Sequence, residues 1–395
     1  MANTNLTADI ILKEAKRIFK NNTPFLQSIN KQYDSTYSVG GAKSGSDIRI
    51  KVPQRNVTRT TKAMNVSDQV EKSVTLSKAS WLGIDLKFSN AELALDLDEF
   101  SAQYIDPQVA TMAGVLDFKL MGLAYKSVYN TASTVGDYTS VATAMEQVTK
   151  MRNSAAPTNG KICSIVDPTN EAALVSSFSG LFQSSDKISN QYVQGKMGTA
   201  LGSDWYMSQG VNSHTRGSAN GNYVVNGADQ TGSSLDVDTG TGTFTVGDVF
   251  TAAGCNAANP VTGEDTGVLQ DFVVTTASAG GTVTLTIEPE IILTGAYKTV
   301  TASPTNGGAI TILGTASAVH PQQLAFHKDA FAFGSVDIEL PKNAEFAARN
   351  NVDGVAMSII RDFDIQNMDT YCRLDMLWGF QSVVPNWACR KYAAA

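Results

Sequence analysis

One segment of the chain, residues 213–319, differs in composition from everything around it. It has nine acidic residues against two basic ones, and it holds 16 of the 32 glycines and 20 threonines, whereas the rest of the 395-residue chain is electrically neutral. An abrupt change of this kind marks a separate domain. The sequence therefore predicts a neutral host, long enough for a sizeable core, with an acidic domain inserted from Ser213 to Val319.

The acidic segment has the alternation of β-strands. Threonines alternate with Val283, Leu285 and Ile287, and others flank Phe244 and Val246 in the same way. A period of two is typical of half-buried strands, and the glycine-rich stretches between such runs fit hairpin turns. Helical periodicity is absent here, so we predict a small all-β domain, either an Ig-like sandwich or a barrel.

The start of the host predicts one helix and two strands. Thr7 is a candidate N-cap for an amphipathic helix that should end near Thr23, before Pro24. Apolar residues then alternate in 48–52 and again in 74–88, which predicts two strands. The polar, basic stretch between them is too long for a tight turn, so it should project as an extended two-stranded loop.

The longest predicted helix begins at Asp106-Pro107, where an N-cap acid precedes a proline at the first helical position. It should continue to Asn130 as a rod of roughly 36 Å, at about 1.5 Å per residue. Its buried stripe is expected at Met112, Leu116, Leu120 and Leu123. The same patterns predict helices at 141–152 and from Thr169, and strands at 162–166, 336–340, 355–360 and 371–380.

Motifs for catalysis or metal binding are missing from the chain. The three histidines stand in no metal-binding arrangement, and no Gly-x-Ser-x-Gly motif supplies a nucleophile for His327 and Asp329. In residues 40–46 a serine follows the last glycine, where a phosphate-binding loop needs a lysine. The acids Asp362, Asp364 and Asp369 lack the spacing of a calcium loop. We therefore predict no catalytic, cofactor or metal site and no enzyme activity.

Cysteine spacing and hydropathy indicate a protein that is neither exported nor inserted in a membrane. The N-terminal region has no uninterrupted apolar run of the kind found in signal peptides. The most apolar stretch, 109–125, is broken by Asp117 and Lys119 and is too short to span a bilayer. Buried, reduced thiols are expected at the four cysteines, which form no CxxC pair: Cys163, Cys255, Cys372 and Cys389.

A run of cations marks the predicted loop, because residues 43–62 contain six basic residues and one acid. The run has no aromatic residue on which a base could stack. We therefore favour contact with another subunit over nucleic-acid binding or a solvated face. The candidate contact residues are Arg49, Lys51, Arg55, Arg59 and Lys62, and the acids that could meet them are Asp229, Asp236, Asp238, Glu264 and Asp265.

The order of these parts resembles the coat proteins of short-tailed bacteriophages that carry an inserted domain. An N-terminal helix, a long basic loop, a long helix and a late β-domain follow one another as they do in that family. Several short stretches strengthen the resemblance: Asp96–Phe100, Pro107–Asp117, Lys126–Asn130, Val246–Phe250, Asn259–Thr262, Gly267–Phe272, Ala302–Pro304 and Leu324–Ala330.

The resemblance implies an α+β chain with the Johnson fold of tailed-phage capsids and an inserted all-β domain. That fold has an N-terminal arm, an extended E-loop, a spine helix, and peripheral and axial domains. Mapped onto this chain, the parts are the N-terminal arm at 1–30, the E-loop hairpin with its flanking strands at 31–97, the spine helix of the peripheral domain at 98–131, the first part of the peripheral and axial domains at 132–212, the insert at 213–319 and the return strands at 320–395.

The resemblance also implies a function, that of a structural major capsid protein of the virion. Members assemble with a scaffolding protein and a portal protein in the bacterial cytoplasm, as hexamers and pentamers of an icosahedral procapsid. The procapsid then matures and encloses double-stranded DNA, which the shell contacts without sequence specificity.

Two other function classes are compatible with the composition. A self-assembling tail or surface-layer protein would share the Thr-rich and Gly-rich β-domain but would need neither E-loop nor spine helix. A carbohydrate-active enzyme would need a carboxylate pair in an aromatic cleft, which a chain with 8% aromatic residues does not evidently offer. Electron microscopy of the purified protein separates the three as closed shells, fibres or rings, and monomers.

Overall fold

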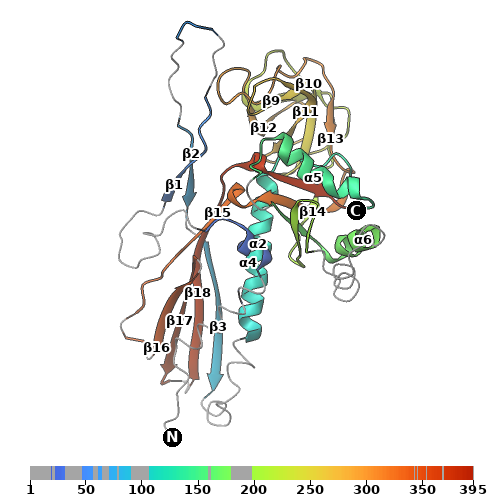
Figure 1. Ribbon diagram of the computed structural model, residues 1–395. Coiled ribbons are helices and arrows are strands. Elements are labelled where there is room, and N and C mark those ends of the chain that lie inside the picture. Colours follow the sequence, from blue (N-terminus) through green and yellow to red (C-terminus); the bar gives the residue numbers. More distant parts are fainter. Residues whose placement is uncertain are drawn as a thin grey trace. The chain divides into compact units, whose positions relative to one another are not determined.

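The computed structural model describes residues 19, 23–31, 47–56, 61–64, 71–77, 80–89, 106–158, 162–178, 198–341, 343–344, 346–352, 354–366 and 369–394. The chain divides into two compact units, each of which is described by itself (Figure 1). Unit 1 consists of Met1–Ile50, Ser73–Leu120 and Phe331–Val383, and unit 2 consists of Lys51–Lys72, Met121–Ala330 and Val384–Ala395.

Unit 1 is built on an antiparallel sheet in which β18 is the central strand. Its order is β15-β18-β17-β16, and β3 also pairs with β18. Alternate residues of β18, among them Cys372, Leu374 and Met376, are buried, which confirms the predicted face. The bounds are β3 Ser80–Ser89, β15 Phe331–Val336, β16 Phe346–Val352, β17 Val355–Asp364 and β18 Asp369–Ser382.

The predicted strand at 336–340 is wrong, because β15 ends at Val336 and residues 337–340 belong to no strand. The preceding segment pairs with β18 instead. Phe331 packs against Phe25 and Phe380, with ring centroids 5.8 and 5.6 Å apart. Burial of these rings stabilises residues 331–336 as the strand. The alternation of apolar residues in 336–340 therefore does not decide where the strand lies.

Helix α4 (Asp106–Ser127) begins in unit 1 and ends in unit 2, close to the predicted range. Met112, Leu116 and Leu120 are buried as predicted, but Leu123 is 48% exposed and Ala124 is buried in its place. At 3.6 residues per turn, the buried stripe continues here at a spacing of four, and Leu123 falls outside it.

A short helix, α2 (Pro24–Ser28), contacts α4 within unit 1. The backbone N–H of Leu26 donates a hydrogen bond of 3.2 Å to the buried carboxylate of Asp117. Thr23, near which the predicted N-terminal helix should end, belongs to no helix, and a separate helix, α2, begins at Pro24. Proline suits the first turn of a helix, where its missing N–H leaves no hydrogen bond unmade. Most of the predicted N-terminal helix lies outside the described residues.

The predicted loop is two-stranded at its base, where β1 (Asp47–Lys51) pairs with β2 (Ser73–Ser77). The single strand predicted at 74–88 is wrong, because β2 ends at Ser77 and β3 begins at Ser80. The two strands pair with different partners, β2 with β1 and β3 with β18. Apolar residues occupy the even positions of both, so the period of two could not reveal the break.

Unit 2 contains a mixed sheet, which we call the carrying sheet, with the order β19-β14-β4-β6-β5 and with β7 paired to β14. Among the described strands of this sheet, β4 and β6 run parallel and the other paired neighbours run antiparallel. The predictions for α5, β4 and α6 are confirmed to within one residue at the ends that were predicted. The bounds are α5 Val141–Asn153, β4 Ile162–Val166, α6 Pro168–Phe178, β5 Thr199–Ala200, β6 Ser203–Met207, β7 Ser213–Thr215, β14 Val319–His327, η3 Lys328–Ala330, η4 Pro385–Trp387 and β19 Ala388–Tyr392.

Six further strands of unit 2 form a closed barrel within residues 224–312. Their order is β13-β10-β11-β12-β9-β8. The two ends of this sheet meet, because the N–H of Ile310 donates to Tyr223 O and that of Val225 to Gly308 O, both at 2.9 Å. One apolar cluster fills the interior. The bounds are β8 Val224–Val225, β9 Gly232–Asp238, β10 Val249–Ala258, β11 Asp265–Val274, β12 Val283–Ile291 and β13 Ile310–Ile312.

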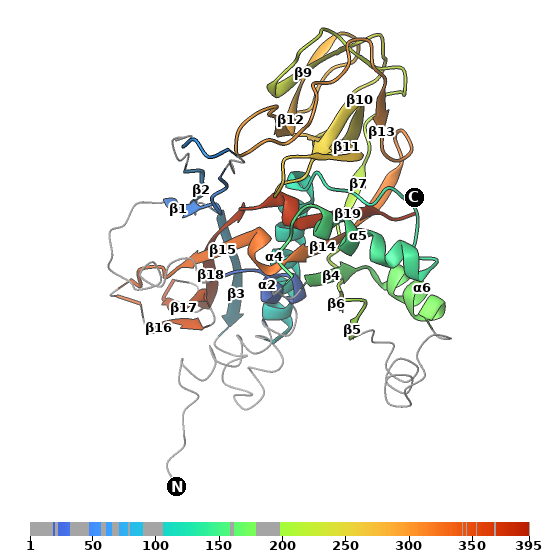
Figure 2. The ribbon, with the colours of Figure 1, turned by 45° about the horizontal axis from the view of Figure 1, so that its top comes forward.

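The acidic segment contains no helix in 213–319, all of which the structure describes, but one of its predicted strands is wrong. Phe244 forms a single bridge to Ser278, and Val246 lies in a turn. The chain bends there because the Thr245 N–H donates to the Asp248 carboxylate at 2.8 Å. Figure 2 shows β7, which lies inside the predicted insert, leading from the carrying sheet to the barrel.

Candidate functional site

The cations of the E-loop begin on β1. Arg49 and Lys51 are exposed and alternate with the buried Ile50, as a half-buried strand requires. Lys51 is paired within the loop, because its Nζ lies 3.0 Å from the Glu71 carboxylate. Arg49 forms no ion pair among the described residues. Of these two candidate contact residues, Arg49 is therefore the one whose charge is left for a partner.

Further along the loop, Arg55 lies close enough to Tyr129 of the same subunit for its charge to act on that side chain. Arg55 is half-buried, and its charge opposes the rise that burial causes in the pKa of Tyr129. Lys72 lies over the ring of Tyr297 of the barrel, at 4.8 Å from the ring centre. Lys62 is exposed, and Arg59 lies outside the described residues. Contact of these cations with a second copy of the chain stays a prediction.

The candidate acids of the barrel lie in separate places. Asp229 is in the turn between β8 and β9, with a φ of 54°. Asp236 and Asp238 share one face of β9. Asp236 accepts a hydrogen bond from the Thr284 hydroxyl, and Asp238 accepts one from the Thr239 hydroxyl. Glu264 and Asp265 lie at the β10–β11 turn, and strand β12 separates β11 from β9 in the barrel.

The acid at the start of β11 is the most firmly held of the five. Asp265 accepts hydrogen bonds from Gly267 N at 2.8 Å and Asn256 Nδ2 at 3.1 Å. These bonds, with the charge of Lys298, lower its pKa. Asp265 therefore stays charged on an exposed turn. Glu264 beside it is exposed and forms no ion pair among the described residues.

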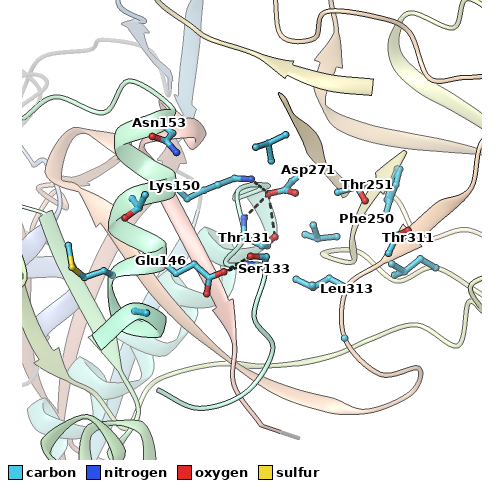
Figure 3. Close-up of a pocket in the computed structure, with 17 residues that line it drawn as sticks. Thr131, Ser133, Glu146, Lys150, Asn153, Phe250, Thr251, Asp271, Thr311 and Leu313 are labelled. Carbon is cyan, nitrogen blue, oxygen red and sulfur yellow. Dashed lines mark hydrogen bonds and ion pairs between the residues drawn. The ribbon is translucent and has the colours of Figure 1, made fainter. Parts of the chain in front are cut away.

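A cavity of about 580 Å³ opens in unit 2 between α5 and strands β10 and β13 of the barrel (Figure 3). On its wall the Lys150 ammonium lies 3.0 Å from the Asp271 carboxylate, which is largely buried. The same carboxylate oxygen accepts hydrogen bonds from the N–H and hydroxyl of Thr131, at 3.1 and 3.4 Å. This buried acid was not among the sequence candidates. Its position before the apolar run Phe272–Val274 was the available signal.

Glu146 lies on another wall of this cavity and fixes the chain that follows α4. Its carboxylate accepts hydrogen bonds from Ser133 and from the N–H of Thr134. Burial alone would raise the pKa of Glu146, but these hydrogen bonds and the nearby Lys391 ammonium lower it. The cavity is thus bounded by acids that are engaged within the subunit, and no two of its carboxylates stand free as an acid and base pair.

The other chemical candidates have structural roles. His327 is buried, its Nδ1 accepts a hydrogen bond from Asp329 N at 3.3 Å, and its ring packs on Trp387. Asp369 pairs with Lys87 at 2.6 Å. The four cysteines, all of them among the described residues, are buried and form no disulfide. Within the described ranges, no group of acids, histidines and cysteines could hold a metal ion. No helix among those ranges is long and apolar enough to cross a membrane.

Several solved structures resemble this chain. The protein of "Mycobacterium phage Che8" is 12% identical, with a TM-score of 0.49 over 93% of this chain and 90% of that one. The "Capsid of empty GTA particle" is 7% identical, with a TM-score of 0.47 over 95% and 90%. The "CUS-3 coat protein I-domain" is 27% identical, with a TM-score of 0.20 over 24% of this chain and 98% of that one.

A search of curated proteins found no match. A family model described as "P22 coat protein - gene protein 5" matches residues 1–389, nearly the whole chain. Coat proteins of this kind assemble with copies of themselves into the shell of a virion, and their role is structural. The chain therefore belongs to the P22 coat protein family and is a major capsid protein of a bacteriophage.

Proposed function

We propose that this protein forms the hexamers and pentamers of an icosahedral procapsid, which assembles with a scaffolding protein and a portal protein in the bacterial cytoplasm. The procapsid then matures and encloses double-stranded DNA. The observation that carries this proposal is the family match over residues 1–389. Shells of this kind are held by many weak contacts repeated by symmetry, so the contact residues of one subunit decide whether the shell closes.

The E-loop supplies one side of the proposed subunit contact. Arg49 is exposed without an ion pair among the described residues, and Lys62 is exposed near the far end of the loop. Exposed cations on a two-stranded projection can contact a second molecule. Clustered charge also speeds encounter with an oppositely charged partner and disfavours wrong pairings.

The barrel supplies the other side. It is acidic, and its segment has two cations, both of them engaged. Arg216 is buried and donates to Ala219 O at 2.9 Å, and Lys298 donates to Gly263 O at 2.9 Å. Its exposed acids Asp229 and Glu264 form no ion pair among the described residues. The E-loop of a neighbouring subunit is the basic surface that would complement them.

The experiment reverses charge on the E-loop. Arg49→Glu combined with Lys62→Glu should reduce the yield of closed shells at least tenfold when the subunit is mixed with scaffolding protein, as counted by electron microscopy. The matched control is Lys119→Glu with Lys126→Glu, which makes the same change of charge on exposed positions of α4. Circular dichroism of the unassembled subunit should be unchanged in both.

The results separate the alternatives. Normal shells from the E-loop variant would contradict the contact, and equal losses in both variants would show that overall charge matters and the loop does not. Tubes, fibres or rings from the parent protein would instead contradict the proposed assembly into a closed icosahedral shell.

A further inference from the structure

We infer that a buried polar cluster at the base of the barrel turns a flexible neck into a rigid joint. The chain enters the barrel through Arg216 and Gly217 and returns through residues 313–318. The two connections are hydrogen bonded to each other, from Arg216 N to Ala318 O at 3.0 Å and from Ser317 N to Gly217 O at 3.4 Å. A two-stranded ribbon is only marginally stable by itself. The direction of the barrel therefore depends on a third attachment.

The third attachment centres on Asp248, which lies in the turn before β10 and is 0% exposed. One of its carboxylate oxygens lies 2.8 Å from Nε2 of His214, on strand β7 of the carrying sheet. The carboxylate also accepts hydrogen bonds from Gly217 N in the neck, at 3.1 Å, and from Thr245 N in the barrel, at 2.8 Å. One side chain thus connects the sheet, the neck and the barrel.

Strand β19 completes the joint from the other side. Arg390 is 0% exposed and donates from Nη2 to the carbonyl oxygen of Gly247, next to Asp248. Its guanidinium lies over the rings of Tyr125 and Tyr392, at 5.9 and 5.3 Å from their centres. Its Nε and Nη1 have no hydrogen-bond partner among the described residues. Burial of a cation is costly, and the Gly247 carbonyl oxygen and the two tyrosine rings are the groups that the structure places against Arg390.

Gly247 is required at the centre of this cluster. Its φ is 100°, a conformation that other residues rarely adopt. A Cβ there would lie 3.3 Å from the ring of His214 and 3.4 Å from that of Tyr125. The turn therefore packs closely against Tyr125 of α4 and against His214 and Arg390 of the carrying sheet.

This joint fixes the direction in which the barrel presents its exposed acids. Without it the barrel would swing about the neck and stay folded, because it has a core of its own. The inference concerns a single subunit, so it can be tested independently of the proposed contacts between subunits.

The test measures the distance between nitroxide labels on the barrel and on α5 in the unassembled subunit, by pulsed electron resonance. The labels are attached through Val261→Cys on the barrel and Asn153→Cys on α5. Val261 is 78% exposed and Asn153 is exposed, whereas the four native cysteines are buried. The parent should give one narrow distance distribution. Asp248→Asn should at least double its width, and the control Asp265→Asn, at an exposed acid of the same barrel, should leave it unchanged.

A broad distribution in the parent overturns the inference, and so does a folded Asp248→Asn variant with the parent's narrow distribution. If that variant does not fold, Tyr392→Phe removes only the hydroxyl that donates to Gly247 O at 3.4 Å. It should broaden the distribution by a smaller amount and speed hydrogen exchange at Gly217. A Tyr392→Phe variant with unchanged width and exchange also counts against the joint.

Discussion

The barrel and the carrying sheet are both β-structures of unit 2, but different forces stabilise them. The barrel buries one cluster of apolar side chains, and most of its charges lie outside. The carrying sheet fully buries Arg390 and Lys391 on β19, with the polar His320 and Gln323 on β14. Buried polar groups stabilise a fold only when their hydrogen bonds are made. The barrel should therefore be sensitive to lost volume, and the carrying sheet to lost hydrogen bonds.

The largest effect is expected from a cavity in the barrel. Phe272 is fully buried and its ring centre lies 5.8 Å from that of Phe250. Phe272→Ala should lower the free energy of unfolding by about 4 kcal/mol, measured by urea titration. Val268→Ala, at a position that is 54% exposed, should change it by less than about 0.5 kcal/mol. Equal losses at the two positions would show that the core does not stabilise the barrel.

A lost hydrogen-bond donor should affect the carrying sheet next most strongly. The amide of Asn130 donates to Asn386 O at 3.0 Å and Ala388 O at 3.3 Å, beside β19. Asn130→Ala leaves two carbonyls without this donor, so a loss of about 2 kcal/mol is expected in the same titration. Asn153→Ala, at an exposed position on α5, is the control and should be neutral. An unchanged free energy of unfolding in Asn130→Ala would contradict the expectation that the carrying sheet is sensitive to lost hydrogen bonds.

Glu146 gives a smaller effect that depends on pH. Its pKa is raised by burial but lowered overall by Ser133, Thr134 and Lys391, so the folded value lies below the unfolded one of about 4.3. The carboxylate therefore contributes fully above the unfolded pKa, and its contribution is lost as the pH falls through the folded pKa. Glu146→Gln should cost about 1 kcal/mol at pH 7 and progressively less at acid pH. A cost independent of pH would exclude the charge as its source.

The smallest effect is expected at the E-loop ion pair. The side chains of Lys51 and Glu71 are 72% and 56% exposed, so water and salt screen their attraction. Lys51→Met should change the free energy of unfolding by less than about 0.5 kcal/mol. A larger loss would show that this pair, unlike others on the surface, orders the loop.

The elements that were predicted correctly are those whose signals are local. Asp106-Pro107 and the apolar stripe predicted α4, and composition predicted the all-β character of the acidic segment. Strand β19 was missed because Arg390 and Lys391 look like surface residues. They are buried because distant parts of the chain cover them, such as the turn at Gly247 that receives Arg390.

The candidate site was predictable only in part, for the same reason. Counting charges identified the E-loop cations and the barrel acids, but it could not show that Lys51 pairs with Glu71 or that Asp271 is buried beside Lys150. No motif joins His214 to Asp248, since the two become neighbours only through the return of the chain between β7 and β10.

The closure of the barrel by β8 and β13 matters when many copies of the domain lie close together. A strand at the edge of an open sheet exposes N–H and C=O groups that can pair with the edge of another molecule. In a capsid the same domain is repeated at short distances, so open edges would meet constantly. A barrel whose last strand bonds to its first leaves fewer such groups free. Many copies can then stand close together while specific side chains, and not loose backbone, decide which surfaces bind.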